Sequence, residues 1–234
     1  MKTLQLCKHG HPPSAVLLTF TYDMNEDDFN DSDTLQWFVN TLLNLNAWDG
    51  RFSWNVAIKD LGDAKYIQFE NSFVLSQTLV PSVDEGSKII ISGDIHLVYS
   101  HIYQVPVIYF NYYYTSGSYL SLEEIEKYIL CNAKDILNAP VHQVILQTEH
   151  PILRRPFFML HPCRTRETLE QFQLSPSDRG PKDCFFPRKY LFTWFHVYGA
   201  LLNLSVPAAY FSSVLKSLEI ERTNEENTSL EEVK

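Results

Sequence analysis

A long segment rich in aromatic and β-branched side chains, residues 89–114, sets the tightest limits on how this chain can fold. The side chains that alternate along its first part are Ile95, Leu97, Tyr99 and Tyr103. A period of two is typical of a strand with one buried face. Pro106 cannot donate a backbone hydrogen bond, so we expect the first strand to end there or to pass the edge of a sheet. Residues 107–114 should then form the next strand.

Shorter patterns on either side of this segment predict a mixture of strands and helices. We expect further strands at residues 52–58, 66–75 and 157–160, and helices at residues 33–43, 121–136, 190–204 and 207–218. Ser121 and Glu124 have the spacing of a capping box, which marks the start of a helix. This order of elements predicts a single α+β domain with a mostly antiparallel sheet and flanking helices.

Acidic residues are concentrated near the two ends of the chain. The chain has 234 residues and a formal net charge of −9, and residues 23–33 and 219–234 hold six acids each. We therefore expect an N-terminal extension with an acidic linker at residues 1–32, a main folded domain at residues 33–218, and an acidic disordered tail after it. The sequence has no basic stripe, so nucleic acid is not an expected partner.

The sequence has no apolar run of the kind that directs a chain into or across a membrane. Residues 15–20 are too few to form the apolar part of a secretory signal. The longest apolar stretch, residues 190–204, is interrupted by polar side chains and falls short of the roughly 18 residues of a membrane span. We therefore expect a cytoplasmic protein with reduced thiols and no transmembrane segment.

One of the four cysteines has the surroundings of a reactive thiol. The four are Cys7, Cys131, Cys163 and Cys184. Cys163 follows a predicted buried strand, and His161 lies two residues before it. The nearby basic residues are Arg154, Arg155, Arg164 and Arg166. Thr165 could cap a short helix, so we expect Cys163 just outside a helix N-terminus, where cations and the helix dipole favour the thiolate.

Other interpretations of this cysteine remain open. A cysteine at a strand end is commonly a small core residue, which is what we expect of the other three. A zinc site would need His150, His161, Cys163 and Cys184 together, and no Cys-x-x-Cys or close histidine pair supports it. A cysteine protease would need a separate base and an orienting residue, and no protease signature is present.

Several motifs around and upstream of Cys163 occur together in one known family. They are Glu149-His150-Pro151-Ile152-Leu153, Pro156 to Thr165 (PFFMLHPCRT), Tyr99-Ser100, Tyr103 to Phe110 (YQVPVIYF), Ser121 to Ile125 (SLEEI), Trp194, and Leu202-Asn203-Leu204 with Pro207. In these motifs the chain resembles the autophagy ubiquitin-like-conjugating enzymes, the family of autophagy-related protein ten. The resemblance covers residues 94–210 well, and residues 33–93 in the order of their elements.

The resemblance implies a ubiquitin-conjugating-enzyme-like fold, with residues 33–218 as its catalytic domain. It implies that Cys163 accepts a ubiquitin-like modifier, autophagy-related protein twelve, from an activating enzyme, autophagy-related protein seven. A lysine of autophagy-related protein five then attacks the thioester. No metal or organic cofactor is expected in either step.

His161 and Tyr103 are the candidates to orient the thiol or to stabilise the oxyanion. Tyr103 corresponds to a strand tyrosine that the family places near its cysteine. Ubiquitin-type enzymes proper use a His-Pro-Asn tripeptide, which this sequence lacks, so the oxyanion donor stays open. Two alternatives also stay open: a non-catalytic binding module, and the sister family that conjugates a modifier to phosphatidylethanolamine. The short loop at residues 80–87 argues against the sister family, which usually carries a long acidic insertion.

Overall fold

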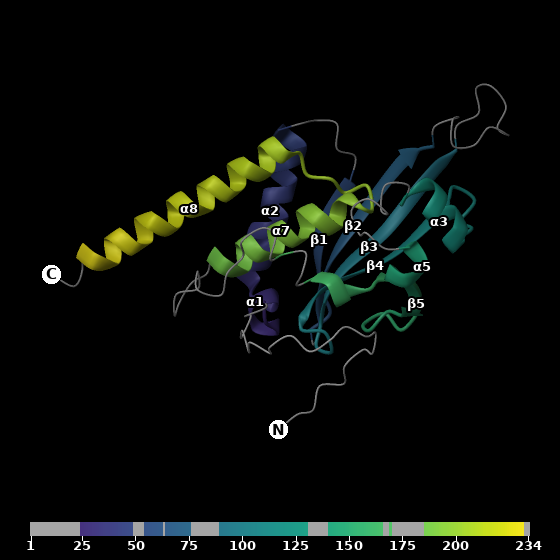
Figure 1. Cartoon of the computed structure of the whole chain (residues 1–234), viewed down its shortest axis with the longest axis horizontal. Coiled ribbons are helices and arrows are strands. Elements are labelled where there is room, and N and C mark those ends of the chain that lie inside the picture. Colours follow the sequence, from purple (N-terminus) through teal and green to yellow (C-terminus); the bar gives the residue numbers. More distant parts are fainter. Residues whose placement is uncertain are drawn as a thin grey trace, which may run out of the picture.

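An antiparallel sheet with helices against it forms the centre of the molecule (Figure 1). The computed structural model describes residues 24–48, 54–62, 64–75, 89–130, 140–165, 169 and 185–231. Its strands are β1 (Trp54–Asp60), β2 (Lys65–Val74), β3 (Ile90–Ser100), β4 (Val105–Tyr114), β5 (Ile145–Glu149) and β6 (Pro156–Leu160). They are ordered β1-β2-β3-β4-β6-β5, and each pairing is antiparallel. The predicted α+β class with a mostly antiparallel sheet is confirmed.

The described helices are α1 (Glu26–Asn30), α2 (Ser32–Trp48), α3 (Leu122–Tyr128), α5 (Val141–Val144), the 3₁₀ helix η1 (Pro162–Arg164), α7 (Phe185–Ala200) and α8 (Ala208–Glu231). Helices α2, α3, α7 and α8 follow the predicted order, whereas α1, α5 and η1 were not predicted. The predicted capping box starts α3: the Glu124 amide donates to Ser121 Oγ at 3.3 Å, and the Ser121 amide donates to Glu124 Oε2 at 2.8 Å. The later part of that predicted helix, residues 131–136, lies outside the described residues.

The β3–β4 hairpin differs from the prediction at its turn. β3 ends at Ser100, which pairs with Val105, and Pro106 lies inside β4 opposite Tyr99. Within the described residues, β6 pairs with β4 only at Tyr109 and Phe110. Pro106 therefore has no strand partner on the β6 side, where its missing N–H would otherwise break a ladder. For this reason the proline does not end the strand.

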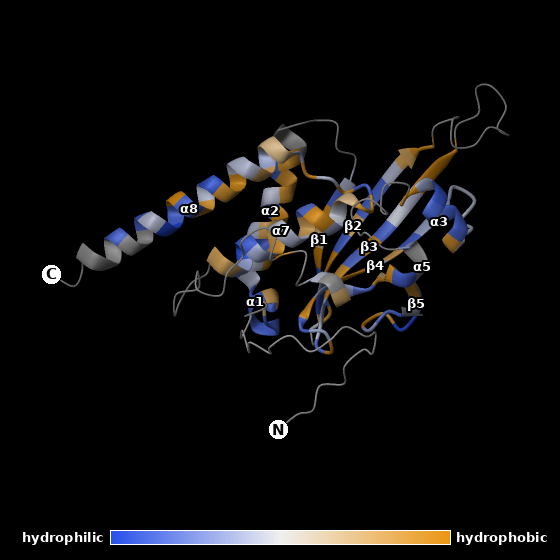
Figure 2. Cartoon of the chain, viewed as in Figure 1, coloured by the Kyte–Doolittle hydropathy of each residue, from blue (hydrophilic) through white to orange (hydrophobic). Residues whose placement is uncertain are grey.

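Alternate residues of the central strands point to two separate cores. The larger core lies between the sheet and the helices and includes Leu97, Ile108 and Phe110. Hydrophobic colours in Figure 2 gather on the strands and on the adjoining α2 and α7. Phe195 of α7 packs there, with ring centroids 5.0 Å from Phe69 and 6.3 Å from Trp54.

The second core lies on the opposite face of the sheet. It holds Val98, Val107 and Tyr109, whose sequence neighbours belong to the larger core. Ile152 and Leu153, from the connection between β5 and β6, pack against it. In the described part of the chain, helices pack on one face of the sheet and the β5–β6 loop packs on the other.

The acidic segment before α2 belongs to the packed structure. Asn25 and Asp28 form a capping box that starts α1, and Met24 and Phe29 are fully buried in the larger core. We expected a linker here because the acids dominate the local sequence. The two apolar side chains among them are sufficient to anchor the segment.

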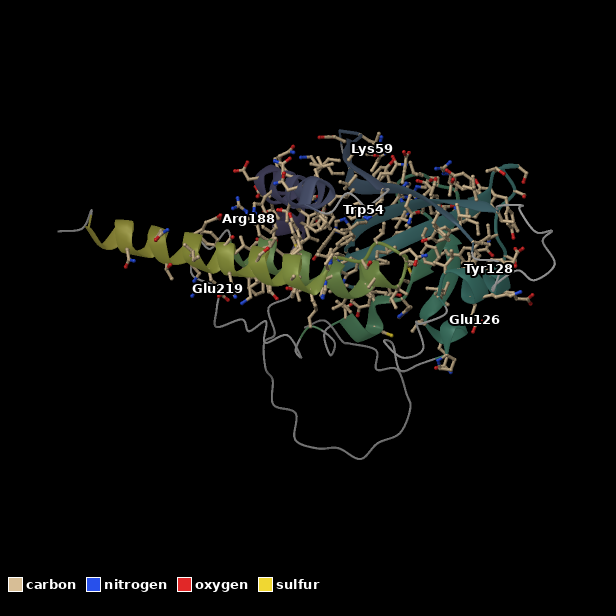
Figure 3. The ribbon with its side chains drawn as sticks, turned by 90° about the horizontal axis from the view of Figure 1, so that it is seen from above. Trp54, Lys59, Glu126, Tyr128, Arg188 and Glu219 are labelled. Atoms are coloured by element: carbon tan, nitrogen blue, oxygen red, sulfur yellow. The ribbon has the colours of Figure 1, made fainter. Side chains whose placement is uncertain are left out.

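Helix α8 leaves the body of the molecule and continues to Glu231, where we expected a disordered acidic tail (Figures 1 and 3). Leu218 is its last residue described as buried, and Glu219 lies on the projecting part in Figure 3. Glutamate is a good helix former, which accounts for helix in a segment with little apolar surface to bury. None of the described helices is both long and apolar enough to cross a membrane.

Candidate active site

Cys163 lies directly beyond the end of a central strand. β6 runs between β4 and β5 and ends at Leu160, and Cys163 is the middle residue of the short η1 helix that follows. The residue is exposed. Cys163 lies inside η1, whose capping residue is His161, and most of the helix predicted after Thr165 lies outside the described residues. β6 is hydrogen-bonded to a strand on each side, so its end, from which η1 and Cys163 follow, is held in place.

The His161 ring joins the cysteine to a second element of the site. The Cys163 amide donates to His161 Nδ1 at 3.2 Å, and His161 Nε2 lies 3.3 Å from Tyr103 Oη. Burial lowers the pKa of His161 and so favours the neutral ring. A neutral ring that accepts at Nδ1 carries its proton on Nε2. In this arrangement His161 donates to Tyr103 Oη.

Tyr103 is brought to His161, but from a turn and not from a strand as predicted. It lies in the four-residue connection between β3 and β4, and its side chain is 41% exposed. The rings of Tyr103 and His161 meet nearly edge to face, with centroids 5.2 Å apart. The period-two pattern from Ile95 has a polar residue, His101, before Tyr103, and extending the strand across His101 hid the turn.

The expected cluster of cations around Cys163 does not form from the described side chains. Arg154 Nη1 lies 3.3 Å from Glu149 Oε1, and Arg155 Nη2 lies 3.4 Å from Asp94 Oδ2. Both arginines belong to the loop between β5 and β6, at the far end of β6 from Cys163. The Arg164 side chain and all of Arg166 lie outside what the structure describes.

A buried chain of two histidines and an aspartate, which the sequence did not reveal, lies on the second core. His150 Nδ1 accepts from the amides of Ile152 and Leu153 at 3.2 and 3.1 Å. Its Nε2 lies 3.1 Å from His96 Nδ1, and His96 Nε2 lies 2.8 Å from Asp94 Oδ1. Burial, with the nearby charges of His96 and Arg155, lowers the pKa of His150 to about 3. His150 therefore fixes the β5–β6 loop as a neutral ring.

The zinc alternative finds no support in the described part of the chain. His150, one of the four proposed ligands, is hydrogen-bonded within the buried His96–His150 pair. Cys184, another proposed ligand, lies outside the described residues, as do Cys7 and Cys131. Among the side chains that are described, no group of three or more His, Cys, Asp or Glu residues could hold a metal ion.

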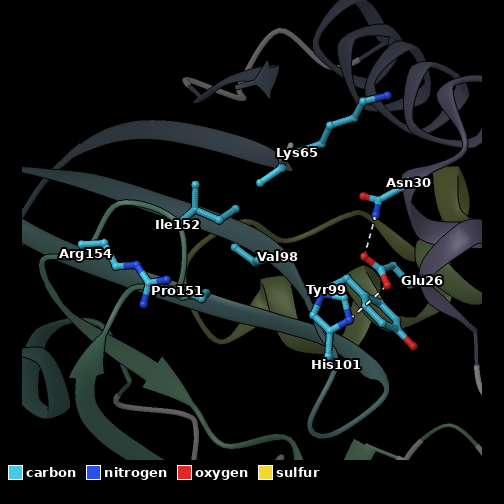
Figure 4. Close-up of a pocket in the computed structure, with 10 residues that line it drawn as sticks. Glu26, Asn30, Lys65, Val98, Tyr99, His101, Pro151, Ile152 and Arg154 are labelled. Carbon is cyan, nitrogen blue, oxygen red and sulfur yellow. Dashed lines mark hydrogen bonds and ion pairs between the residues drawn. The ribbon is translucent and has the colours of Figure 1, made fainter. Parts of the chain in front are cut away.

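A pocket of about 350 Å³ lies beside the β3–β4 turn, on the side of α1 (Figure 4). Val98, Tyr99 and Ile152 give it an apolar part, and Lys65 and Arg154 stand at different sides of it. Glu26 bridges two neighbours there, because His101 Nδ1 lies 3.0 Å from one carboxylate oxygen and Asn30 donates to the other at 3.3 Å. Cys163, His161 and Tyr103 do not line this pocket. The Cys163 side chain is therefore exposed at the surface outside this pocket.

Comparison with known proteins agrees with the predicted resemblance. The family described as autophagocytosis associated protein, active-site domain, matches residues 19–209. Proteins called ubiquitin-like-conjugating enzyme ATG10 are similar to this chain: the one from Arabidopsis thaliana is 39% identical over 115 residues, and the one from Homo sapiens is 36% identical over 122. These matches cover 49% and 52% of this chain and 50% and 53% of the relatives, so the chain spans about half the length of the curated relatives it matches. The chain therefore belongs to the autophagocytosis-associated protein family, and the part that matches its active-site domain includes Cys163, His161 and Tyr103.

Proposed function

We propose that this protein is a ubiquitin-like-conjugating enzyme that uses Cys163 as its acyl carrier. The observation that carries the proposal is the exposed Cys163, tied through its backbone to His161 and through His161 to Tyr103, in a member of this family. An exposed cysteine can take an acyl group from another protein, which a buried one cannot.

The proposed reaction has two acyl transfers. The Cys163 thiolate attacks the thioester carbonyl between the modifier's C-terminal glycine and the activating enzyme, and the thiolate of the activating enzyme leaves. A lysine amine then attacks the new thioester, the C–S bond breaks, and an isopeptide bond forms; Cys163 leaves as the thiol, with the proton that the amine gives up. Dividing the acylation in this way replaces one difficult step with two easier ones.

In this proposal Tyr103 supplies the hydrogen bond to the oxyanion, and His161 orients it. The lone pair of neutral His161 is occupied by the Cys163 amide, so the ring is not set up to accept a proton from the attacking lysine. Its Nε2 proton is directed to Tyr103 Oη, which leaves the hydroxyl proton of Tyr103 for another acceptor. One such donor contributes on the order of 3 kcal/mol to an acyl-transfer transition state.

The proposed partners follow from the family. The modifier is autophagy-related protein twelve, the donor is autophagy-related protein seven, and the acceptor lysine belongs to autophagy-related protein five. We place the reaction in the cytoplasm, where thiols stay reduced. No cofactor is needed, because ATP is consumed by the activating enzyme.

The test is a reconstituted transfer with three acceptors. The protein is first charged with activating enzyme, ATP and modifier, and the adduct is followed on non-reducing gels. The charged protein is then mixed with autophagy-related protein five, with vesicles of phosphatidylethanolamine, or with buffer. We expect rapid discharge to the protein lysine alone. Discharge to the lipid would assign the chain to the sister activity, and failure to charge would support a binding module.

A further inference from the structure

We infer that Gln104 is a positioning residue, which holds Tyr103 against His161 by means of a left-handed backbone in the β3–β4 turn. This inference rests on the proposed function, because it explains how the same site keeps its proposed oxyanion donor in place. Gln104 has φ 58°, a conformation that residues with a side chain adopt at a cost. It directly follows Tyr103 and precedes the first residue of β4.

Positive φ angles also occur in other connections beside the strands. The β1–β2 turn has Gly62 at φ 85°, the turn after β4 has Gly117 at φ 84°, and the β5–β6 connection has Arg154 at φ 56°. A Cβ at either glycine would meet nothing within 4 Å, so the backbone angle, and not lack of space, accounts for glycine there. The β3–β4 turn also needs a residue with a positive φ angle, and glutamine occupies that position.

The turn is closed tightly around Tyr103. The Gln104 amide donates to the Ser100 carbonyl at 2.7 Å, and the Tyr103 amide lies 3.4 Å from Ser100 Oγ. Ser100 pairs with Val105, so the connection spans only four residues. The direction in which Tyr103 leaves this turn is therefore set by the backbone angles of very few residues, among them Gln104.

A side chain at position 104 restricts the turn in a way that glycine would not. Glycine occupies both signs of φ readily, so it would allow the turn more conformations, in many of which Tyr103 Oη leaves His161. The 3.3 Å contact joins two side chains that are both partly exposed. Glutamine at this position thus lowers the stability of the turn but restricts the orientation of Tyr103. Strained residues of this kind are common at functional sites.

The test compares Gln104→Gly with Gln104→Asn. Asparagine adopts the left-handed conformation more readily than other residues with a side chain, so it keeps the restriction at little cost. We expect Gln104→Gly to charge normally, to melt at the wild-type temperature or above it, and to discharge about tenfold more slowly. Gln104→Asn should discharge within about twofold of wild type. In a Tyr103→Phe background, Gln104→Gly should cause no further slowing, since both changes act through one hydroxyl.

A measurement without turnover separates this inference from the proposed function. The nuclear Overhauser effect between the Tyr103 and His161 rings, whose centroids are 5.2 Å apart, should weaken in Gln104→Gly and persist in Gln104→Asn. An unchanged ring contact in Gln104→Gly would overturn the inference, as would discharge at the wild-type rate. If Gln104→Asn discharged as slowly as Gln104→Gly, the inference would also be overturned, because the slowing would then come from loss of the glutamine side chain and not from the backbone angle. Failure of the wild type to charge would overturn the proposed function while the ring contact still tested the turn.

Discussion

His161 and His150 are both histidines whose pKa is lowered by burial, yet they belong to two different kinds of polar structure. His150 is fully buried, and the hydrogen bonds of its ring end on the β5–β6 loop and on His96. His161 is partly exposed, and its chain of contacts ends on the Tyr103 hydroxyl at the surface. A chain that ends inside the protein stabilises a loop. A series of contacts that links an exposed cysteine to a hydroxyl at the surface is available for chemistry.

The largest effect is expected when the buried His150 is removed, which tests its role in stabilising the β5–β6 loop. In His150→Ala, the amides of Ile152 and Leu153 lose their acceptor and His96 loses a partner. We expect the free energy of unfolding in urea to fall by about 3 kcal/mol. His150→Asn keeps a side-chain oxygen for nearby amides and should lose less. A fall below about 1 kcal/mol in His150→Ala would contradict the structural role.

The next effect is the pH dependence of stability. The pKa of His150 is about 3 in the folded protein and near 6.5 in the unfolded chain, which therefore binds more protons below pH 6.5. The contribution of His150 is fully present above pH 6.5 and is lost as the pH falls toward 3. At pH 5 the loss is about 2 kcal/mol.

Urea unfolding at pH 7 and pH 5 measures this loss as a difference in the free energy of unfolding. We expect the difference to be smaller in His150→Asn than in the wild type. Burial also lowers the pKa of His161 and His196, so they contribute in the same direction. Burial would raise the pKa of Asp94, but hydrogen bonds and charge from His96, Gln68 and Arg155 lower it overall, and its effect begins at more acidic pH. An equal pH dependence in wild type and His150→Asn would show that His150 titrates normally.

Tyr103→Phe tests the series of contacts that runs from Cys163 through His161 to Tyr103. The substitution should leave the free energy of unfolding almost unchanged. The ring and its edge contact with His161 remain, and only the hydroxyl is lost. We expect normal charging and a single-turnover discharge slower by roughly a hundredfold, since one oxyanion donor contributes on the order of 3 kcal/mol. His161→Ala should slow discharge as well, because Tyr103 loses its partner. Discharge of Tyr103→Phe at the wild-type rate across pH would make Tyr103 an ordinary turn residue.

The smallest effect is expected from the projecting part of α8. Ending the chain after Leu218 removes residues 219–234 and leaves the last residue of α8 that is described as buried. The melting temperature should stay within a few degrees of the full chain, since surface segments contribute little. A large drop in melting temperature would show that the segment docks.

The elements that could be predicted from the sequence were those with local signals. Ser121 and Glu124 form the expected capping box because every atom in it lies within four residues. The strands at residues 54–60 and 65–74 follow their alternation of side chains. His161 and Cys163 lie together because they are two residues apart.

The elements that were missed depend on strand register. His96 and His150 are 54 positions apart, and only the order β3-β4-β6-β5, with the folding of the β5–β6 loop onto the sheet, brings them together. The turn at Tyr103 was hidden because a turn of four residues preserves the period of two.

The measurement that tests the central claim most directly is the mass and the chemical stability of the adduct on position 163. Wild type charged with activating enzyme, ATP and modifier should carry one modifier that dithiothreitol releases. Cys163→Ser should carry it as an oxyester that resists dithiothreitol but is cleaved by mild alkali, because an alkoxide is a poorer leaving group than a thiolate. Cys163→Ala should carry none. A thiol-sensitive adduct on Cys163→Ala, or full transfer by Cys163→Ser, would contradict the account.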